Sequence, residues 1–208
     1  MTTKPKQKSP AAPEETAPGR RQLLLAGMKL FAERGFAGVG LREIAAEAGV
    51  SLGLVRTHFG SKDGLRAAID EHVLEEIKHL YATVLEHSGT EALGMAVEDA
   101  LEWISRDRDA LMYARMALME KSPGSQALFD EILSIMRQFI DMNAKRGLLQ
   151  PGVDREWAAI YLVFDFIGPA IVEPFAKSAF GKSMYSKPMI AARNAFMVRT
   201  FTRGFLKG

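Results

Sequence analysis

The chain has 208 residues, 48% of them hydrophobic, which is enough to bury the core of one or two domains. It contains no cysteine, and this excludes disulfides and thiolate metal sites. Residues 1–66 carry 11 basic and 6 acidic side chains, whereas the remaining residues carry 16 basic and 19 acidic ones. A basic N-terminal part on a mildly acidic remainder favours a polyanion as partner, and chance clustering is the alternative.

Residues 1–19 are rich in Pro, Ala, Lys and Thr and have no aromatic side chain, which predicts a disordered tail. The three lysines of this tail, Lys4, Lys6 and Lys8, could enter a minor groove as an arm, or the tail only adds solubility. No apolar central stretch follows these lysines, so we expect no secretory signal and a cytoplasmic protein.

The rest of the chain has the apolar periodicity of helices, and no segment has the strict alternation of a strand. The stretch "RRQLLLAGMKLFAERGF" predicts a first helix that ends at Gly35, and "LREIAAEAG" predicts a short second helix. Ser51 and Ser61 are expected to cap the third and fourth helices. Further helices are expected at about 90–106, 108–121, 125–147, 154–178 and 187–206, and the predicted fold class is therefore all-α.

The second and third helices have the spacing of a helix-turn-helix. Ile44 and Ala48 are expected to face inward, Gly49 permits a left-handed turn, and Val50 and Val55 anchor the next helix to the same small core. This places four other residues of the third helix on its outer side: Leu52, Gly53, Arg56 and Thr57. Nine helical residues span roughly 13 Å, which suits a major groove about 12 Å wide.

With its "LFAERGF", "IAAEAGVS" and "HFGSK" motifs in this order, the segment from Arg20 to Leu65 resembles the DNA-binding domain of the tetracycline-repressor (TetR) family of bacterial transcriptional regulators. The resemblance implies a homodimer, a roughly palindromic operator on double-stranded DNA, usually repression, and release by a small molecule. It also divides the chain into the tail at 1–19, a DNA-binding domain at 20–65 and a helical effector-binding and dimerisation domain at 66–208.

The sequence departs from the family pattern at Arg56, where a Tyr is common, and at Gly40, where a Ser or Thr often caps the second helix. Arg56 could therefore contact a phosphate or a guanine. The expected phosphate contacts are Arg42, Ser51, His58 and Lys62, and the expected base contacts are Leu52, Leu54, Arg56 and Thr57, with Gly53 allowing close approach. As alternatives, Arg42 and Lys62 are solvated charges, and His58 and Leu54 belong to the small core.

The stretch from Trp157 to Val172 is apolar or small at every position except Asp165, and a helix that is apolar all round is buried all round. We expect one of its faces on the chain's own core and another on a second subunit, with a large monomeric core as the alternative. In the last helix Arg193, Arg199 and Arg203 are expected to stand apart from the apolar stripe. The dimer candidates are Trp157, Tyr161, Ile171, Phe175, Val198, Phe201 and Phe205.

Release requires a pocket in the second domain, and a ligand that tilts the long fourth helix would change the separation of paired recognition helices. The pocket candidates are Trp103, Met112, Tyr113, Met116, Met119, Phe129, Ile132, Met136, Phe139, Phe164, Asp165 and Phe166. The methionines could instead be plain core. Asp165, a lone carboxylate among apolar residues, is expected either to meet a ligand or to bond at the dimer seam.

No arrangement of a nucleophile and a base, and no paired catalytic carboxylates, stand out, so we expect no enzyme activity and no cofactor. His72 and His79 lie seven residues apart on one helix, about 10 Å, which is too far to share a metal unaided. Two rival functions stay open: a helical small-molecule-binding protein or enzyme without DNA binding, and a DNA binder that acts as an activator or a nucleoid-type protein.

Overall fold

The computed structural model describes residues 18–87 and 89–206; for some residues near 83–84 and within 90–105 only the backbone is described. The tail lysines therefore lie outside the described residues. In the described part the chain forms helices and one isolated antiparallel bridge between Leu149 and Leu206, and the predicted all-α fold is confirmed.

The helices follow one another in the predicted order. They are α1 (Pro18–Arg34), α2 (Leu41–Glu47), α3 (Leu52–Phe59), α4 (Lys62–Glu86), α5 (Gly89–Arg106), α6 (Arg108–Glu120), α7 (Ser125–Lys145), α8 (Arg155–Phe180) and α9 (Lys187–Gly204). Helix α1 already begins at Pro18, two residues inside the predicted tail.

Local chemistry explains why the helices begin and end where they do. The Ser51 hydroxyl accepts a hydrogen bond from the Leu54 N–H (3.4 Å), and the Ser61 hydroxyl accepts one from the Gly64 N–H (3.0 Å), so both predicted caps are confirmed. Gly49 takes a φ of +67° between α2 and α3, the left-handed conformation that glycine adopts without strain.

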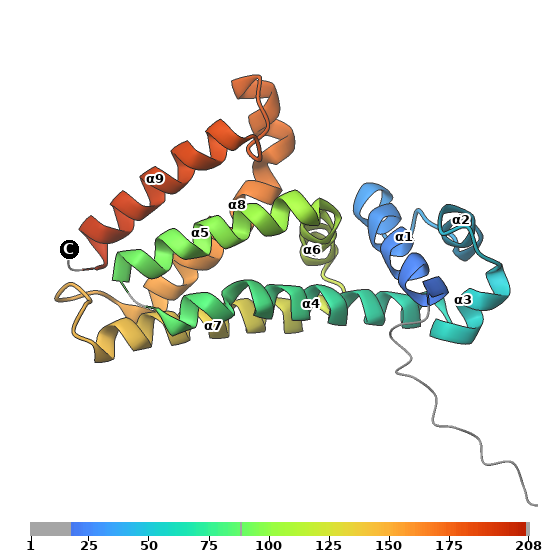
Figure 1. Ribbon diagram of the computed structural model, residues 1–208, viewed down its shortest axis with the longest axis horizontal. Helices are drawn as coiled ribbons and strands as arrows, with labels where there is room; N and C mark the ends of the chain where they lie inside the picture. Colours follow the sequence, from blue (N-terminus) through green and yellow to red (C-terminus); the bar gives the residue numbers. More distant parts are fainter. Residues whose placement is uncertain (1–17, 88, 207–208) are drawn as a thin grey trace, which may run out of the picture.

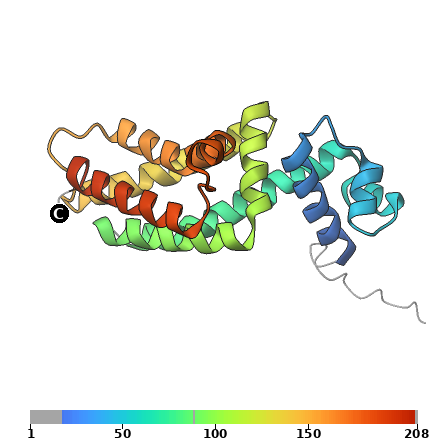
Figure 2. The same ribbon diagram turned by 90° about the horizontal axis from the view of Figure 1, so that it is seen from above.

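Helices α1, α2 and α3 form a small bundle at one end of the molecule (Figure 1). Its core contains Leu23, Phe31, Ile44 and Val55, all fully buried, which confirms the inward positions predicted for Ile44 and Val55. The bundle rests on α4 and α6, since α1 packs against both of them. Seen from above, it stands apart from the larger group of helices except at these contacts (Figure 2).

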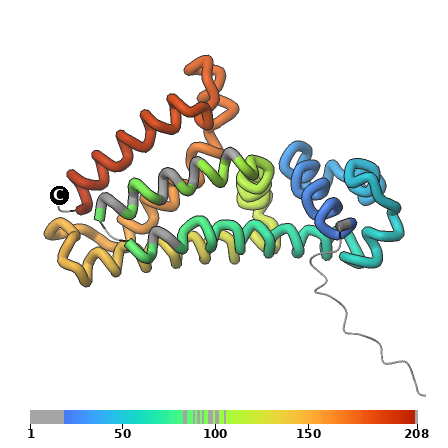
Figure 3. Tube along the Cα trace, in the orientation of Figure 1, coloured from blue at the N-terminus to red at the C-terminus, as the bar shows by residue number. Residues whose placement is uncertain are grey.

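Helix α4 is a single continuous helix that begins in the small bundle and runs along the larger domain (Figure 3). Its predicted stripe of Ile69, Val73, Ile77 and Leu80 is buried, whereas the Val84 side chain lies outside the described part. Within the larger domain α4 packs on α5 and α7, α7 packs on α8, and α5 packs on α9. One rigid element therefore connects the two ends of the molecule.

Helix α8 has one buried and one exposed apolar face. The buried face contains Ala158, Ala159, Leu162 and Val163, and Pro169 and Pro174 lie inside the helix. In the part of the chain that the structure describes, α8 alone is long and apolar enough to pass as a membrane span by length and composition. A buried core helix passes the same test, so this is weak evidence for a membrane.

Candidate DNA-binding surface and effector region

Helix α3 presents a polar face to solvent at the outer end of the small bundle. Gly53, Arg56 and Thr57 are exposed, whereas Val55 on the opposite side is fully buried. The Thr57 hydroxyl donates to the Gly53 carbonyl (3.0 Å), so it is held against the backbone of α3 although the residue is exposed. The outer face of this helix can therefore reach a duplex without moving the core beneath it.

Two apolar residues of α3 and its histidine are only half-buried. Leu52 and Leu54 pack against the core, and Leu54 lies so close to α1 that a Cβ at Gly19 would be 2.6 Å from its Cδ2. The His58 ring lies edge-on to Phe59, with ring centroids 6.2 Å apart. The base contact expected for Leu54 thus disagrees with its position, because the side chain anchors α3 to α1.

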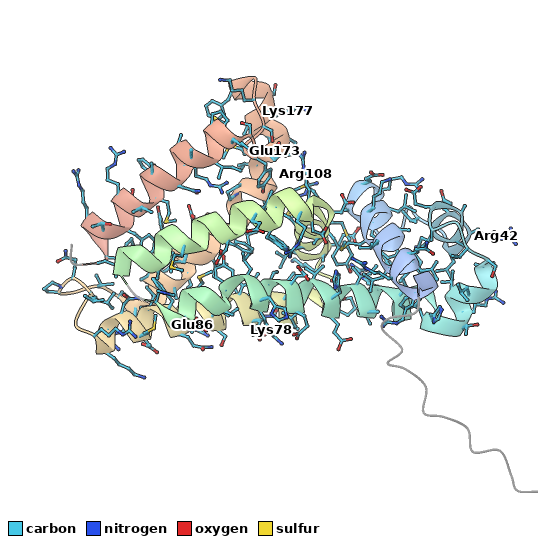
Figure 4. All side chains as sticks on the ribbon, in the orientation of Figure 1. Arg42, Lys78, Glu86, Arg108, Glu173 and Lys177 are labelled. Carbon is cyan, nitrogen blue, oxygen red and sulfur yellow. The ribbon has the colours of Figure 1, made fainter. Side chains whose placement is uncertain are left out.

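Helix α2 carries one exposed cation and two neutralised carboxylates. Arg42 points away from the molecule at its outer end (Figure 4). Glu43 pairs with Arg34 (3.1 Å) and Glu47 pairs with Lys29 (2.6 Å), both on α1. The Gly40 N–H donates to Glu43, so that bond and the Arg34 partner lower the pKa of Glu43, and Lys29 lowers the pKa of Glu47. These ion pairs hold both carboxylates against α1, so the positive charge of Arg42 dominates the exposed end of α2.

Lys62, an expected phosphate contact, has partners inside the protein. Its ammonium donates to the Phe36 carbonyl and lies over the Phe36 ring, 4.3 Å from the centroid. The side chain is half-buried. The structure thus corrects the expectation of a free cation here: Lys62 fastens the turn between α1 and α2 to the start of α4.

Glu120, in the last turn of α6, contacts the small bundle from the other side. One carboxylate oxygen accepts from the Phe36 N–H (3.1 Å), and the other accepts from the Arg66 guanidinium (3.2 Å) on α4. The Arg66 guanidinium lies over the Phe36 ring at 4.3 Å. Helix α6 is therefore joined directly to both the DNA-binding end and the connecting helix, a link that sequence spacing gave no sign of.

The twelve predicted pocket residues differ in burial, and nine of them belong to the hydrophobic core or pack against it. Trp103, Tyr113, Met116, Ile132, Met136 and Phe139 are buried in the core, and Met112, Phe129, Asp165 and Phe166 are half-buried. Met119 and Phe164 are 62% and 60% exposed, so these two candidates are wrong as wall residues in a single chain. The Tyr113 hydroxyl donates to Asp70 on α4 (2.6 Å), and burial together with this bond raises the pKa of Tyr113.

Asp165 belongs to a group of polar side chains from three helices and a connection. Tyr81 of α4, Arg193 of α9 and Tyr185 of the segment between α8 and α9 are close enough for their charges to influence one another. Burial raises the pKa of Asp165, and Arg193 opposes that shift. Arg193, expected to stand apart from the apolar stripe, is half-buried, and its Nε and Nη1 atoms are buried.

The dimer candidates on α8 are exposed in the single chain, whereas those on α9 are half-buried or buried. Trp157, Tyr161, Ile171 and Phe175 are exposed on one stripe of α8, together with Phe164. Phe201 is fully buried in its own chain, where its ring stacks on Phe205 at 4.7 Å and contacts Tyr161 at 5.7 Å. Phe201 is therefore a core residue and not available to a partner, while Val198 and Phe205 are half-buried.

A polar cavity of about 900 Å³ lies between the small bundle and the larger domain. Its lining includes Arg20, Arg21, Leu24 and Met28 from α1, Glu71, His72, Glu75 and His79 from α4, Arg106 at the end of α5, and Asp107 and Asp109 at the start of α6. A smaller cavity of about 230 Å³ beside it is lined by Trp103, Leu80 and Glu102, among others. Most of the predicted pocket residues thus lie away from these two spaces.

Comparison with known proteins finds similarity to bacterial transcription regulators. Residues 23–69 match the model of "Bacterial regulatory proteins, tetR family". The chain is 34% identical over 143 residues to the HTH-type transcriptional regulatory protein RaaS of Mycobacterium tuberculosis, covering 66% of this chain and 62% of that protein. It is 40% identical over 129 residues to the HTH-type transcriptional repressor Rv3405c of the same organism, covering 61% and 60%.

The alignments thus span somewhat less than two thirds of these relatives' lengths. A solved structure of a TetR transcriptional regulator from Chloroflexus aurantiacus has the same fold, with a TM-score of 0.70, 18% identity, and coverage of 90% of this chain and 96% of that one.

Proposed function

Because this chain belongs to the tetR family of bacterial regulatory proteins, we propose that it binds a roughly palindromic operator as a homodimer and represses transcription until a small molecule releases it. A protein with this task works where bacterial DNA lies, which puts it in the cytoplasm. The observation that carries the proposal is the outward face of α3, with Arg56 and Thr57 in solvent over a core fixed by Val55.

The proposed contacts divide by chemistry. Arg56 reaches a base edge, where its guanidinium can bind guanine through two hydrogen bonds, and Thr57 lies beside it. Arg42 and Ser51 contact phosphates on either side, and Gly53 lets the backbone approach closely. Leu52 and His58 border this surface and contribute less, since both are partly held by the core.

Dimerisation through α8 is supported by its exposed apolar stripe. Trp157, Phe164 and Phe175 are 65%, 60% and 76% exposed in the single chain, and soluble monomers rarely expose such a contiguous series of large apolar side chains. A second copy that covers this stripe would form a four-helix interface with α8 and α9. The two α3 helices would then read half-sites about 34 Å apart.

Effector release is supported by the connections between the two ends of the molecule. Helix α4 is continuous, and Glu120 joins α6 to the turn before α2. A ligand that binds one arrangement of α4 and α6 more tightly than another would change the position of α3. The polar cavity beside α1 leaves room for that movement.

The test is a gel-shift titration with an operator library and a series of salt concentrations. We expect affinity to fall steeply with salt through counterion release, and Arg56→Ala to weaken binding about 10- to 100-fold and to change base preference. Arg203→Ala, at an exposed position far from α3, is the matched control and should leave affinity unchanged.

Two outcomes would overturn the proposal. Absence of any duplex complex would favour a helical ligand-binding protein, and diffuse coverage in footprinting would favour a nucleoid-type binder over a regulator of one palindrome. An Arg56→Ala variant with wild-type affinity and preference would remove this residue from the reading surface.

A further inference from the structure

Tyr185, just before α9, and Arg193, within α9, have buried hydrogen-bond donors without a partner. In the part of the chain that the structure describes, Arg193 Nε, Arg193 Nη1 and Tyr185 Oη are buried and have no hydrogen-bond partner. Leaving a buried donor unpaired is costly, and most of all for a charged group. An acceptor from outside the chain would complete these bonds.

The carboxylates nearest to these donors do not complete them. Glu173 is buried, but its oxygens accept from the Ser183 hydroxyl (2.5 Å) and the Met184 N–H (2.7 Å), and Arg108 lies 3.8 Å away (Figure 4). Asp165 interacts with Arg193 only at longer range, since it forms no ion pair with a described residue. Glu173 is thus occupied by the connection between α8 and α9, and Arg193 still lacks an anion in contact.

Aromatic rings lie near these donors, beside the charged groups already named. Tyr81 is nearly fully buried on α4, and its ring meets Phe166 of α8 edge-on with centroids 5.4 Å apart. The Tyr185 ring lies below the Arg108 guanidinium, 6.0 Å from its centroid. A molecule that satisfies Arg193 and Tyr185 would therefore place its polar end at α9 and its body against aromatic rings from α4 and α8.

We propose that Arg193 and Tyr185 bind the carboxylate of an amphipathic effector, whose apolar part packs against Tyr81 and Phe166. The assignment rests on the proposed function, because it names the ligand class of the effector region. A guanidinium presents parallel N–H groups that match a carboxylate, and the Tyr185 hydroxyl adds a third donor. Unpaired donors outnumber the single carboxylate of Asp165, which favours an anionic ligand over a cationic one.

The experiment measures binding of octanoate, decanoate and naphthoate to the full chain by calorimetry and thermal unfolding, each against its primary amide and its amine. We expect the carboxylates to bind and the amides and amines to bind at least about tenfold more weakly. Arg193→Gln should weaken carboxylate binding by at least about tenfold, and Tyr185→Phe by a smaller factor. Arg199→Gln, an exposed position on the same helix, should bind like the wild type.

Thermal unfolding without ligand separates a binding role from a structural one. Since Arg193 buries charge without a partner, Arg193→Gln should keep or raise the melting temperature of the ligand-free protein. A structural arginine would lower it. Tyr185→Phe, which removes one oxygen, keeps the binding test available if Arg193→Gln folds poorly.

Amides or amines that bind as tightly as the carboxylates, or a panel of which no member binds, would overturn the assignment. So would Arg193→Gln with undiminished binding. Gel shifts on the same preparations keep the two proposals apart. A chain that binds carboxylates but no operator refutes the regulatory function alone, and a chain that binds operator but no carboxylate refutes only the ligand class.

Discussion

Glu120→Gln is the substitution that most directly tests the junction between α6 and the DNA-binding end. The Glu120 carboxylate accepts from the Phe36 N–H at 3.1 Å and from Arg66 Nη2 at 3.2 Å. The Arg66 side chain is only 9% exposed, whereas that of Glu120 is 36% exposed. A glutamine keeps the shape of the side chain and an acceptor for Phe36 but removes the negative charge opposite Arg66.

The expected loss follows from these exposures. Removing one partner of a fully buried ion pair costs about 3–5 kcal/mol, because it leaves the other charge buried and unpaired. Here water reaches Glu120, and the Arg66 guanidinium keeps its contact with the Phe36 ring at 4.3 Å, so the cost should be lower. We expect the free energy of unfolding to fall by about 1–2 kcal/mol. For a chain of this length that corresponds to a decrease in Tm of roughly 2–8 °C.

Thermal unfolding followed by circular dichroism measures this difference. The matched control is Glu75→Gln on α4, since Glu75 forms an exposed ion pair with Lys78 at 2.8 Å. Exposed pairs contribute little, so the control should leave the free energy of unfolding nearly unchanged. If Glu120→Gln and Glu75→Gln lower the Tm equally, the contacts of Glu120 with Phe36 and Arg66 contribute little to stability. These contacts then cannot transmit movement from α6 to α3.

Three further substitutions test other parts of the molecule. Gly53→Ala should leave the free energy of unfolding unchanged or raise it by up to about 1 kcal/mol, since the added Cβ would lie 3.7 Å from the Ser51 hydroxyl. Gel shifts should nevertheless show weaker operator binding by this variant. Undiminished affinity would refute the close approach of the backbone to DNA at Gly53. Phe175→Glu, on the exposed stripe of α8, should keep the helical circular dichroism but sediment as a monomer, and a persisting dimer would contradict the proposed interface. Burial raises the pKa of Asp70, so the wild type loses stability as pH rises through that raised pKa. The stability of Asp70→Asn relative to the wild type, measured by chemical denaturation, should therefore increase from acidic to neutral pH. A difference that does not depend on pH would refute this.

The positions of the helices could be predicted from the sequence because their signals are local. Ser51 and Ser61 cap helices within three residues of themselves, and glycine at position 49 fixes the turn between α2 and α3. The inward positions of Ile44 and Val55 follow from periodicity within two short helices. None of these features depends on a distant part of the chain.

The errors concern residues whose surroundings come from far along the chain. Lys62 bonds to Phe36, 26 residues earlier, and nothing near Lys62 in the sequence indicates this. An arginine on an amphipathic helix has the pattern of a solvated charge, and the residues near Arg193, Tyr81 and Asp165, come from distant parts of the chain. Periodicity also cannot tell which of two apolar faces meets the chain's own core, which is why Phe201 was expected outside and Phe164 inside.

The exposed stripe of α8 links the turnover of this protein to its concentration in the cell. Until another copy covers Trp157, Phe164 and Phe175, a newly made chain offers chaperones and proteases a hydrophobic surface to bind. If the proposed dimer forms, pairing becomes more complete as the concentration rises, and scarce chains would be cleared faster than abundant ones. Turnover and assembly would thereby set a lower limit to the amount of working regulator.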